Sequence, residues 1–366
     1  LFCDQSGESL LAILFSASDS GSNGAANSKL AMTQYTQPAL FALEWSLAEM
    51  WQANGVKPSV VIGHSVGEIV AACVSGVMSV EDGMRLAVER GRLMQALPLG
   101  EGIMVVTRAG YAAVEAAIKA LELASTVSVA AVNSPSNVVV AGTKDSVNAV
   151  MGHLGVEGRR LDVSHAFHSP LMRPIEHSYR AVVQSVKLRP GNLTVISTVT
   201  GNMATDEELM DVEHWVRQLW SPVLFQQALE VAFGLDVTEQ TDSLGIMAVL
   251  ELGPNPVLTG LSKPWVTRRL QRTVTWATSI DRKSSASALV IIEQAKKFKV
   301  SVIGVSKNAD VIRAALPQAT VIDGPDASTE IAAITCDIVL NAITGSIGLA
   351  PTLAALKVGN RLALAN

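Results

Sequence analysis

The chain has 366 residues, of which 49% are hydrophobic and 17% are charged, so it can bury a large core and is long enough for two or more domains. Its formal net charge of −5, without a long basic run, argues against a nucleic-acid-binding surface. No apolar stretch approaches the roughly 20 residues that a membrane span needs, and the chain does not begin like a signal peptide. The three cysteines lack metal-ligand spacing and are typical of a reducing compartment, so we predict a cytoplasmic protein without a metal site.

The first predicted elements lead to a sharp turn that carries a serine. A long helix is expected from about Thr36 to Ala53, then a strand at Ser59–Ile62 and a helix over 68–74. The unbroken apolar strand predicts burial on both faces, as in a parallel sheet. Between strand and helix lies a G-x-S-x-G sequence centred on Ser65, which is the pattern of a nucleophile elbow. Ser65 is therefore a candidate nucleophile at the positive end of a helix, where an oxyanion would be stabilised.

Residues 102–164 predict a small inserted subdomain. Their pattern gives the order β-α-β-β-α-β, which is the signature of a ferredoxin-like unit and fits into about 60 residues. The expected elements are strands at 103–107, 127–132, 137–141 and 159–163, and helices at 112–123 and 145–154. The fold class we predict is α/β, with a hydrolase-like parallel-sheet core that contains this insert.

The rest of the chain returns to the core and then changes character. A helix over 174–187 and strands at 193–199 and 246–252 are expected to complete the core, and a basic, then Ser-rich stretch over 265–285 marks a boundary. An α/β rhythm restarts at 288, with strands at 300–304, 320–322 and 336–340, which predicts a partial Rossmann-like segment. The predicted domains are 1–101 with 165–282, 102–164, a linker over 283–290, and 291–366.

The histidines offer a base for Ser65, since a nucleophilic serine needs one within hydrogen-bond reach. His153, His177 and His214 have polar surroundings and are expected at the surface. His64 lies on the turn itself, where it is better placed to orient the loop. The candidates are His165 and His168, in an apolar-flanked loop after a strand, and their spacing does not choose between them.

Arg90 is the most informative charged residue. On the helix predicted over 79–97 it shares a face with Leu86, Leu93, Met94 and Leu97. A guanidinium among leucines needs an anion, which would be either a structural carboxylate or the carboxylate of a substrate. A second charge, Glu68, is expected either to compensate the helix dipole or to hold the turn.

Together these motifs resemble the acyltransferase domain of modular polyketide synthases, a family related to the malonyl-CoA:acyl-carrier-protein transacylases of fatty-acid synthesis. The resemblance covers about residues 1–282 and rests on five motifs in the family's order, namely Tyr35–Leu43, Gly63–Glu68, Arg90–Gln95, Val163–Met172 and Glu251–Leu258. It implies that a malonyl group passes from coenzyme A to an ester on Ser65, and then to the phosphopantetheine thiol of an acyl carrier protein. A neighbouring ketosynthase domain is the second partner that it implies, and no cofactor is needed beyond the thioester substrate.

The resemblance also implies residue roles. His168 becomes the base and Arg90 the clamp for the malonyl carboxylate, while the Val66 N–H is an oxyanion donor, Gln37 lines the site and a loop carbonyl near Asn255 orients the histidine. His64, His165 and Phe167 join the substrate-binding set, since His165-Ala-Phe-His168 with Val66 resembles malonyl-selective members. The family's first strand and its Gly-Gln-Gly loop have no match here. We therefore expect exposed apolar surface in the core and a slower reaction, by roughly 10²–10³ for one lost oxyanion donor.

The C-terminal part resembles a fragment of 1-deoxy-D-xylulose 5-phosphate reductoisomerase, an enzyme of isoprenoid synthesis. The matching motifs are Asn341–Leu353 and Leu362–Asn366. The family places the nicotinamide nucleotide of NADPH near the residues that correspond to Ala342, Ile343, Thr344, Gly345 and Asn366. Because the glycine-rich phosphate loop and the catalytic and metal-binding carboxylates have no match, we expect neither NADPH binding nor reductoisomerase activity.

Two alternatives to acyl transfer stay open. The same elbow would serve a serine hydrolase, for which Asp162 is a candidate third member before the histidine loop. The other is a catalytically silent fusion of two partial domains, whose C-terminal part only binds a nucleotide or binds nothing. Arg90 in the apolar stripe favours the transferase.

Overall fold

The computed structural model describes residues 29–235, 244–270, 273–279, 300–305, 309–324, 326–335, 338–341 and 361–364, and the single residues 9, 10, 13, 292, 295, 296, 354, 357 and 358. The chain divides into two compact units, which are described separately. Unit 1 contains residues 1–13 and 24–278, and unit 2 contains residues 14–23 and 279–366.

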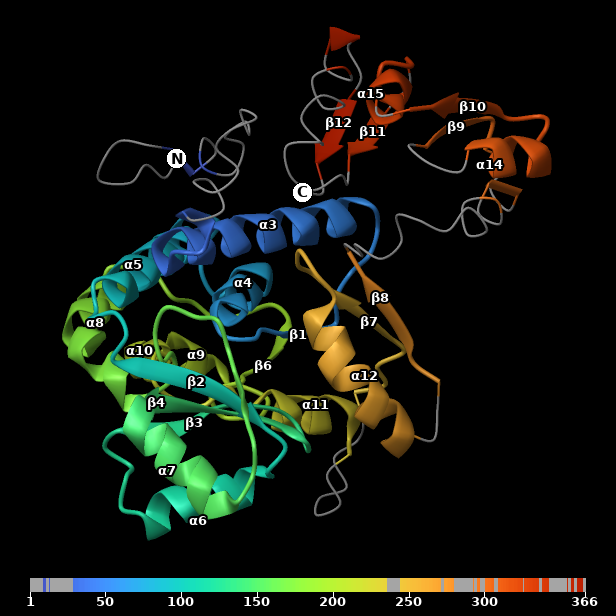
Figure 1. Ribbon diagram of the computed structural model, residues 1–366. Helices are drawn as coiled ribbons and strands as arrows, with labels where there is room; N and C mark the ends of the chain where they lie inside the picture. The colour runs from blue at the N-terminus through green and yellow to red at the C-terminus, as the bar shows by residue number, and fades with distance from the viewer. Residues whose placement is uncertain are drawn as a thin grey trace. The chain divides into compact units, whose positions relative to one another are not determined.

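The large part of unit 1 is a mixed α/β structure in which short parallel strands lie among helices (Figure 1). Its elements are α3 (Thr33–Ala53), β1 (Val60–Ile62), α4 (Val66–Val74), α5 (Val80–Gln95), the 3-10 helix η1 (Pro170–Ile175), α8 (Glu176–Gln184), β6 (Thr194–Ile196), α9 (Asp206–Met210), α10 (Val212–Arg217), α11 (Phe225–Phe233), β7 (Ala248–Glu251), α12 (Val257–Arg269) and β8 (Thr275–Thr278). The helices and strands predicted for this part occur in the predicted order, whereas α9, α10, α11, α12 and β8 were not predicted.

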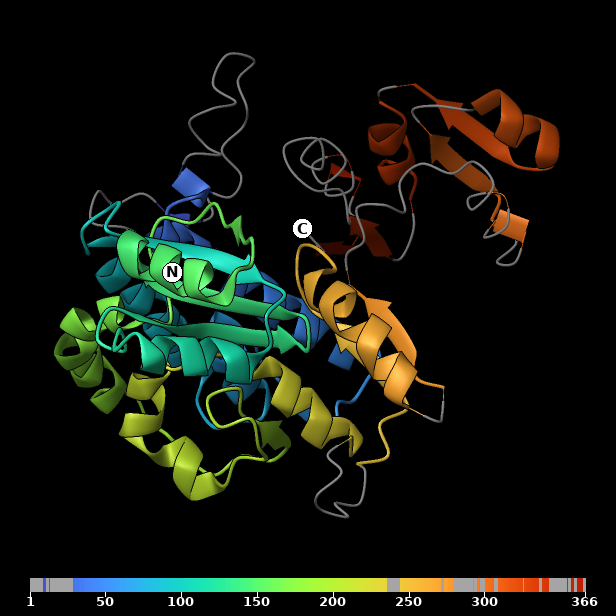
Figure 2. The same cartoon turned by 60° about the horizontal axis from the view of Figure 1, so that its bottom comes forward.

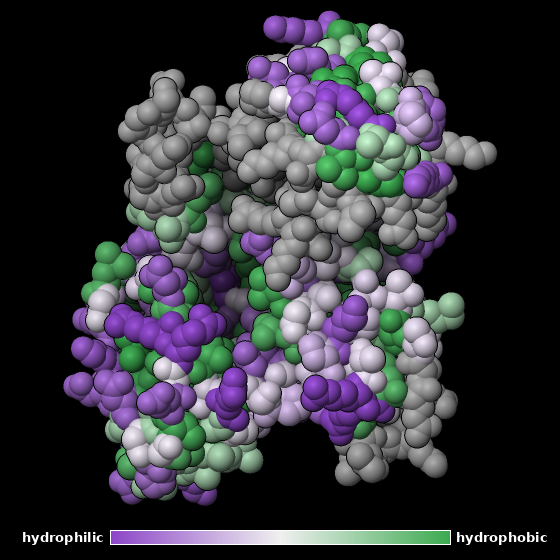
Figure 3. Space-filling model, turned by 45° about the vertical axis from the view of Figure 1, so that its right-hand side comes forward, coloured by the Kyte–Doolittle hydropathy of each residue, from purple (hydrophilic) through white to green (hydrophobic). Residues whose placement is uncertain are grey.

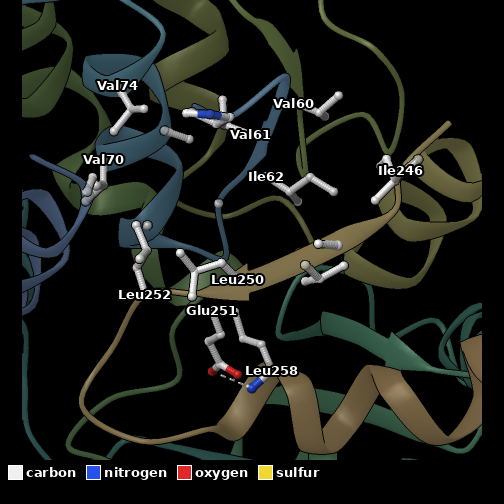
Figure 4. A pocket seen from close by; sticks show the side chains of 18 of the residues that line it. Val60, Val61, Ile62, Val70, Val74, Ile246, Leu250, Glu251, Leu252 and Leu258 are labelled. Atoms are coloured by element: carbon white, nitrogen blue, oxygen red, sulfur yellow. Dashed lines mark hydrogen bonds between the residues drawn. The ribbon is translucent and has the colours of Figure 1, made fainter. Parts of the chain in front are cut away.

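The prediction that the strand before Ser65 is buried on both faces is wrong. Val60, Val61 and Ile62 are each half-buried. Within the described residues β1 has one strand neighbour, β6, which it joins in parallel, while β7 pairs in parallel with β8 in a separate sheet. The other side of β1 lines a cavity of about 400 Å³ that it shares with β7 (Figure 4). Without a second neighbouring strand, the apolar side chains of β1 keep part of their surface outside the core.

Helices α3, α4 and α5 form the tightest part of this core. Ile69 and Ala72 of α4 and Leu86 of α5 are completely buried. The closest approach is at Gly83, where an added Cβ would lie 2.3 Å from the sulfur of Cys73. The start of α5 is as predicted, because the Ser79 hydroxyl accepts a hydrogen bond from the Asp82 amide. This packing determines the direction in which α5 presents Arg90.

The small part of unit 1 consists of β2 (Gly102–Thr107), α6 (Tyr111–Ala120), β3 (Val127–Ser134), β4 (Asn137–Thr143), α7 (Lys144–Leu154) and β5 (Arg159–Arg160). The four strands form an antiparallel sheet in the order β3-β4-β2-β5, and α6 and α7 cover one of its faces (Figures 1 and 2). Side chains alternate accordingly: Val105 and Val140 pack under these helices, whereas Met104 and Ala141 pack in the same cluster as α11 residues of the large part. The last strand ends at Arg160, three residues earlier than predicted.

Unit 2 contains two parallel strand pairs, β9 (Val302–Val305) with β10 (Thr320–Asp323) and β11 (Ile338–Asn341) with β12 (Arg361–Leu364). Its helices are α14 (Ala309–Ala315) and α15 (Ala327–Ala332). The first three strands lie where the sequence predicts them. The residues assigned to NADPH, 342–345 and 366, fall outside the described residues.

A helix that crosses a membrane must be both long and apolar. None of the helices in the described part of the chain has the required combination of length and apolar character. On the face shown in Figure 3, hydrophilic and hydrophobic residues are interspersed rather than gathered in one field.

Candidate active site

Ser65 lies on a strained turn between β1 and α4. Its backbone has φ 55° and ψ −117°, which is unfavourable for a residue with a Cβ and is typical of functional turns. The turn requires glycine at 63, where an added Cβ would lie 2.2 Å from the Glu68 amide nitrogen. A Cβ added at Gly67 would lie 3.3 Å from a side-chain carboxylate oxygen of Glu44, which can move. A backbone contact therefore requires glycine at 63 but not at 67.

The start of α4 leaves one amide free beside the serine. The amides of Gly67 and Glu68 donate to the carbonyls of His64 and Ser65, both at 3.0 Å. Within the described residues the Val66 N–H has no acceptor, and the Ser65 hydroxyl does not cap the helix. An oxyanion formed at Ser65 would therefore find the Val66 N–H at the positive end of the helix.

His168 is the histidine that meets Ser65. Its Nε2 lies 2.7 Å from the Ser65 Oγ, and its Nδ1 lies 2.9 Å from the carbonyl oxygen of Ser221. Because a carbonyl only accepts, Nδ1 carries the proton and Nε2 is free to accept the serine proton. The expectation that a carbonyl near Asn255 orients the base is wrong: the Asn255 carbonyl accepts from the Val257 amide, and the sequence pattern had no signal for Ser221.

The other two histidines near the turn have structural partners. His165 is buried, its Nε2 donates to the Leu97 carbonyl at 3.0 Å, and its Nδ1 lies 2.9 Å from the Ser164 hydroxyl. Both ring nitrogens of His165 therefore have partners other than Ser65. Of the two histidines between which spacing could not choose, His168 is the base. His64 donates from Nε2 to the Asn133 side-chain oxygen at 2.9 Å, which joins the turn to β3 of the small part.

Burial, then the nearby charge of Arg90 and the neighbouring His64, lower the pKa of His168 to about 3. A base with a lowered pKa stays neutral as the pH falls through the ordinary histidine range, and is lost only near the lowered value. We therefore expect Ser65 to react with a fluorophosphonate probe at a rate that does not titrate between about pH 5 and pH 8. Mass spectrometry of timed samples measures this rate. A midpoint near 6.5 would contradict the buried, neutral base.

Arg90 points at the nucleophile. It is 2% exposed, its Nη2 donates to the Ser65 Oγ at 3.3 Å, and its Nη1 donates to the Gln37 Oε1 at 2.6 Å. Gln37 is itself held by the Thr33 hydroxyl at 2.8 Å. Within the described residues Arg90 forms no direct ion pair; burial lowers its pKa, while the buried Glu68 carboxylate raises it only through space. A buried cation of this kind favours an anionic ligand beside Ser65.

A second buried cluster, formed by Glu68, Ser197 and Thr198, packs against the turn. The carboxylate of Glu68 is fully buried and accepts from the hydroxyls of Ser197 at 2.6 Å and Thr198 at 2.7 Å. This favours the reading in which Glu68 holds the turn. The prediction that His214 is a surface residue is wrong: it is 0% exposed, because α10 packs its polar-flanked side inward against Glu68.

The remaining predicted residues lie apart from the reacting atoms. Phe167 is partly buried between two core clusters, with its ring 5.9 Å from that of His165. Asp162, the candidate third member for a hydrolase, is exposed, and a backbone carbonyl occupies the position that an acid would take at His168. The cavity of about 400 Å³ has neither Ser65, His168 nor Arg90 in its wall, so it is not the catalytic cleft.

A serine on a strained strand-to-helix turn, with a histidine base and a buried arginine, defines a serine-dependent acyl-transfer site. Residues 1–263 match the family model described as acyl transferase domain, so the chain belongs to this family. Residues 278–366 match the family model of 1-deoxy-D-xylulose 5-phosphate reductoisomerase.

Individual relatives agree with this assignment. The chain is 37% identical over 276 residues, 75% of its length, to the PKS-NRPS hybrid synthetase acdB of Aspergillus candidus, and spans only 10% of that relative. The acyltransferase domain from the second module of the salinomycin polyketide synthase is 34% identical with a TM-score of 0.64, covering 78% of this chain and 65% of that one. A type II PKS malonyl-transacylase, solved in complex with its acyl-carrier protein, is 31% identical with a TM-score of 0.61, covering 75% and 82%.

Proposed function

We propose that unit 1 transfers a malonyl group from coenzyme A to the phosphopantetheine thiol of an acyl carrier protein, through an ester on Ser65. The observation that carries this proposal is the guanidinium of Arg90, buried without an ion pair and 3.3 Å from the Ser65 Oγ. A cation in that position binds an acyl group that is itself an anion, and malonyl carries a carboxylate two bonds from its thioester carbonyl.

The geometry supports a two-step transfer. In the first step the Ser65 Oγ attacks the thioester carbonyl as its proton passes to Nε2 of His168, and the Val66 N–H receives the developing oxyanion. The intermediate collapses with loss of the coenzyme A thiolate, which takes the proton from the imidazolium. In the second step the thiol of the carrier protein attacks the ester, His168 receives the thiol proton, and Ser65 regains it as the thioester leaves.

Substrate choice is assigned to Arg90, Gln37 and the loop over 165–168. Gln37 holds one arm of the guanidinium at 2.6 Å, which leaves the fork oriented toward the nucleophile. His165, Phe167 and His64 shape the surrounding wall through the contacts described above. This arrangement would favour a carboxylated acyl group over a neutral one.

The partners and the finer architecture follow from the same proposal. The acyl carrier protein is the acceptor, and a ketosynthase domain is the neighbour that the polyketide synthase relatives suggest. We assign the small part to the ferredoxin-like class, on its β-α-β-β-α-β order, and the strand pairs of unit 2 to a Rossmann-like fragment of 291–366 without NADPH binding. The proposed domain boundaries are those predicted from the sequence, and the proposed location is the cytoplasm.

The test is to incubate the chain with malonyl-CoA, quench it with acid and measure the intact mass. We expect an increase of one malonyl group that maps to Ser65, is absent in Ser65→Ala, and disappears on addition of a holo acyl carrier protein, which becomes malonylated. Release of free malonate without the carrier would indicate a hydrolase instead. No adduct on a folded chain would support the silent fusion.

A further inference from the structure

The segment that ends α10 touches both members of the Ser65–His168 pair. The side-chain amide of Gln218, the C-cap residue directly after α10, donates to the backbone carbonyl of Ser65 at 2.9 Å. Three residues later the Ser221 carbonyl receives the Nδ1 proton of His168 at 2.9 Å. Both contacts therefore come from residues that directly follow α10, one to the nucleophile and one to its base.

His214 lies on α10 one turn before Gln218, and its backbone carbonyl accepts from the Gln218 amide at 3.1 Å. Its imidazole is completely buried between two carboxylates: Nε2 lies 3.5 Å from Glu68 and Nδ1 lies 3.5 Å from Glu208. Neither contact is a hydrogen bond, so the attraction is that of ion pairs. The acidic residue beside it, Glu213, points to Arg180 of α8 at the surface.

Glu68 connects His214 to the turn that holds Ser65. Its carboxylate accepts from Thr198, whose hydroxyl also lies 2.9 Å from the carbonyl of Gly63, two residues before the nucleophile. Glu68 therefore contacts both the start of the turn, through Thr198, and α10, through His214. A buried carboxylate left without a cation here would be costly, which makes the pair interdependent.

We propose that His214 is a positioning residue, whose imidazolium between Glu68 and Glu208 holds α10 against the Ser65 turn so that Gln218 and Ser221 align Ser65 with His168. The predicted effect on the malonylation rate rests on the proposed function, whereas the contacts of His214 do not. The charge it needs is present near neutral pH: burial lowers the pKa of His214, but Glu208 and Glu68 outweigh burial and raise it to about 9.

The first experiment compares His214→Gln with the wild-type chain in single-turnover malonylation of Ser65 over a range of malonyl-CoA concentrations. We expect the maximal rate constant to fall by about 10-fold to 100-fold, as displaced catalytic groups do, with the half-saturation concentration within about twofold. The wild-type rate should also fall as the pH rises through about 9, a step that His214→Gln lacks, because the wild type loses the imidazolium there. His177→Gln, the same change at an exposed histidine of α8, should leave both constants unchanged.

The second measurement needs no malonyl group. The rate at which a fluorophosphonate labels Ser65 should fall in parallel in His214→Gln, and this arm separates the proposal from the proposed function if the wild type is labelled but not malonylated. If circular dichroism shows that His214→Gln does not fold, Glu208→Gln replaces it. This variant removes one anion from a half-buried position and should lower the labelling rate in the same direction by a smaller factor. A labelling rate within twofold of the wild type in the folded variants would overturn the positioning role. So would a change in the half-saturation concentration of malonyl-CoA with an unchanged maximal rate constant.

Discussion

The His168→Ala variant is expected to form the Ser65 ester about 10⁴-fold to 10⁶-fold more slowly than the wild-type chain, as losses of a nucleophile's base do in serine enzymes. The reason is that Nε2 of His168 lies 2.7 Å from the Ser65 Oγ and is unprotonated, whereas the Arg90 nitrogen that also contacts this oxygen is a donor. Quenched-flow sampling of the malonyl adduct by intact mass measures the rate constant.

The matched control is His165→Asn, at the other histidine of the same loop. Its two ring nitrogens contact the Leu97 carbonyl and the Ser164 hydroxyl and neither contacts Ser65, so the change is expected to lower stability and to slow ester formation far less than His168→Ala does. Comparable loss of rate in His165→Asn and His168→Ala, with both folded, would show that the histidine of the pair has been assigned wrongly.

Arg90→Ala is expected to lower the rate of malonyl transfer by about 10²-fold to 10³-fold, the consequence of leaving a carboxylate without its buried partner. Acetyl transfer should change far less, because an acetyl group has no carboxylate for the guanidinium to bind. Parallel single-turnover rates with malonyl-CoA and acetyl-CoA give the ratio that reports the clamp, and preference should shift toward the neutral acyl group.

Arg92→Ala is the control for this prediction. It removes a guanidinium from the same helix, on the solvent side, where Arg92 pairs with Glu89 at 2.6 Å. An exposed pair of this kind contributes little, so both rates should stay within about twofold of the wild type. An equal fall in malonyl and acetyl transfer for Arg90→Ala would mean that Arg90 acts on Ser65 itself rather than on the acyl carboxylate.

Local patterns in the sequence were enough to predict most helices and strands and to identify Ser65 as the nucleophile. The Gly63–Gly67 turn, the apolar run before it and the helical pattern after it are short-range features, and the turn is formed by contacts within a few residues, such as Gly63 against the Glu68 amide. The Ser79 cap and the β-α-β-β-α-β order are local in the same sense. Arg90 could be singled out because a charge within an apolar helical stripe is visible from spacing alone.

Contacts between distant parts of the chain could not be read in this way. Ser221 lies more than 50 residues from His168 and holds it through a backbone carbonyl, and Gln218 lies more than 150 residues from Ser65 and holds its backbone carbonyl through a side-chain amide. A backbone carbonyl leaves no trace in residue type, so no local pattern could correct the family resemblance, which implies an orienting carbonyl near Asn255. His214 was placed at the surface because its neighbours in sequence are polar, although one of its two anions comes from α4.

The sequence by itself therefore determined the elbow, its serine and the cation that would select an anionic acyl group, since each depends on residues close together in the chain. Spacing left His165 and His168 open, and although the family resemblance implies His168, only the tertiary structure gives the physical reason: both nitrogens of His165 have other partners, whereas Nε2 of His168 meets Ser65. It also decided that β1 is half-exposed, because burial of a strand depends on the neighbours that the fold places beside it rather than on its own apolar residues.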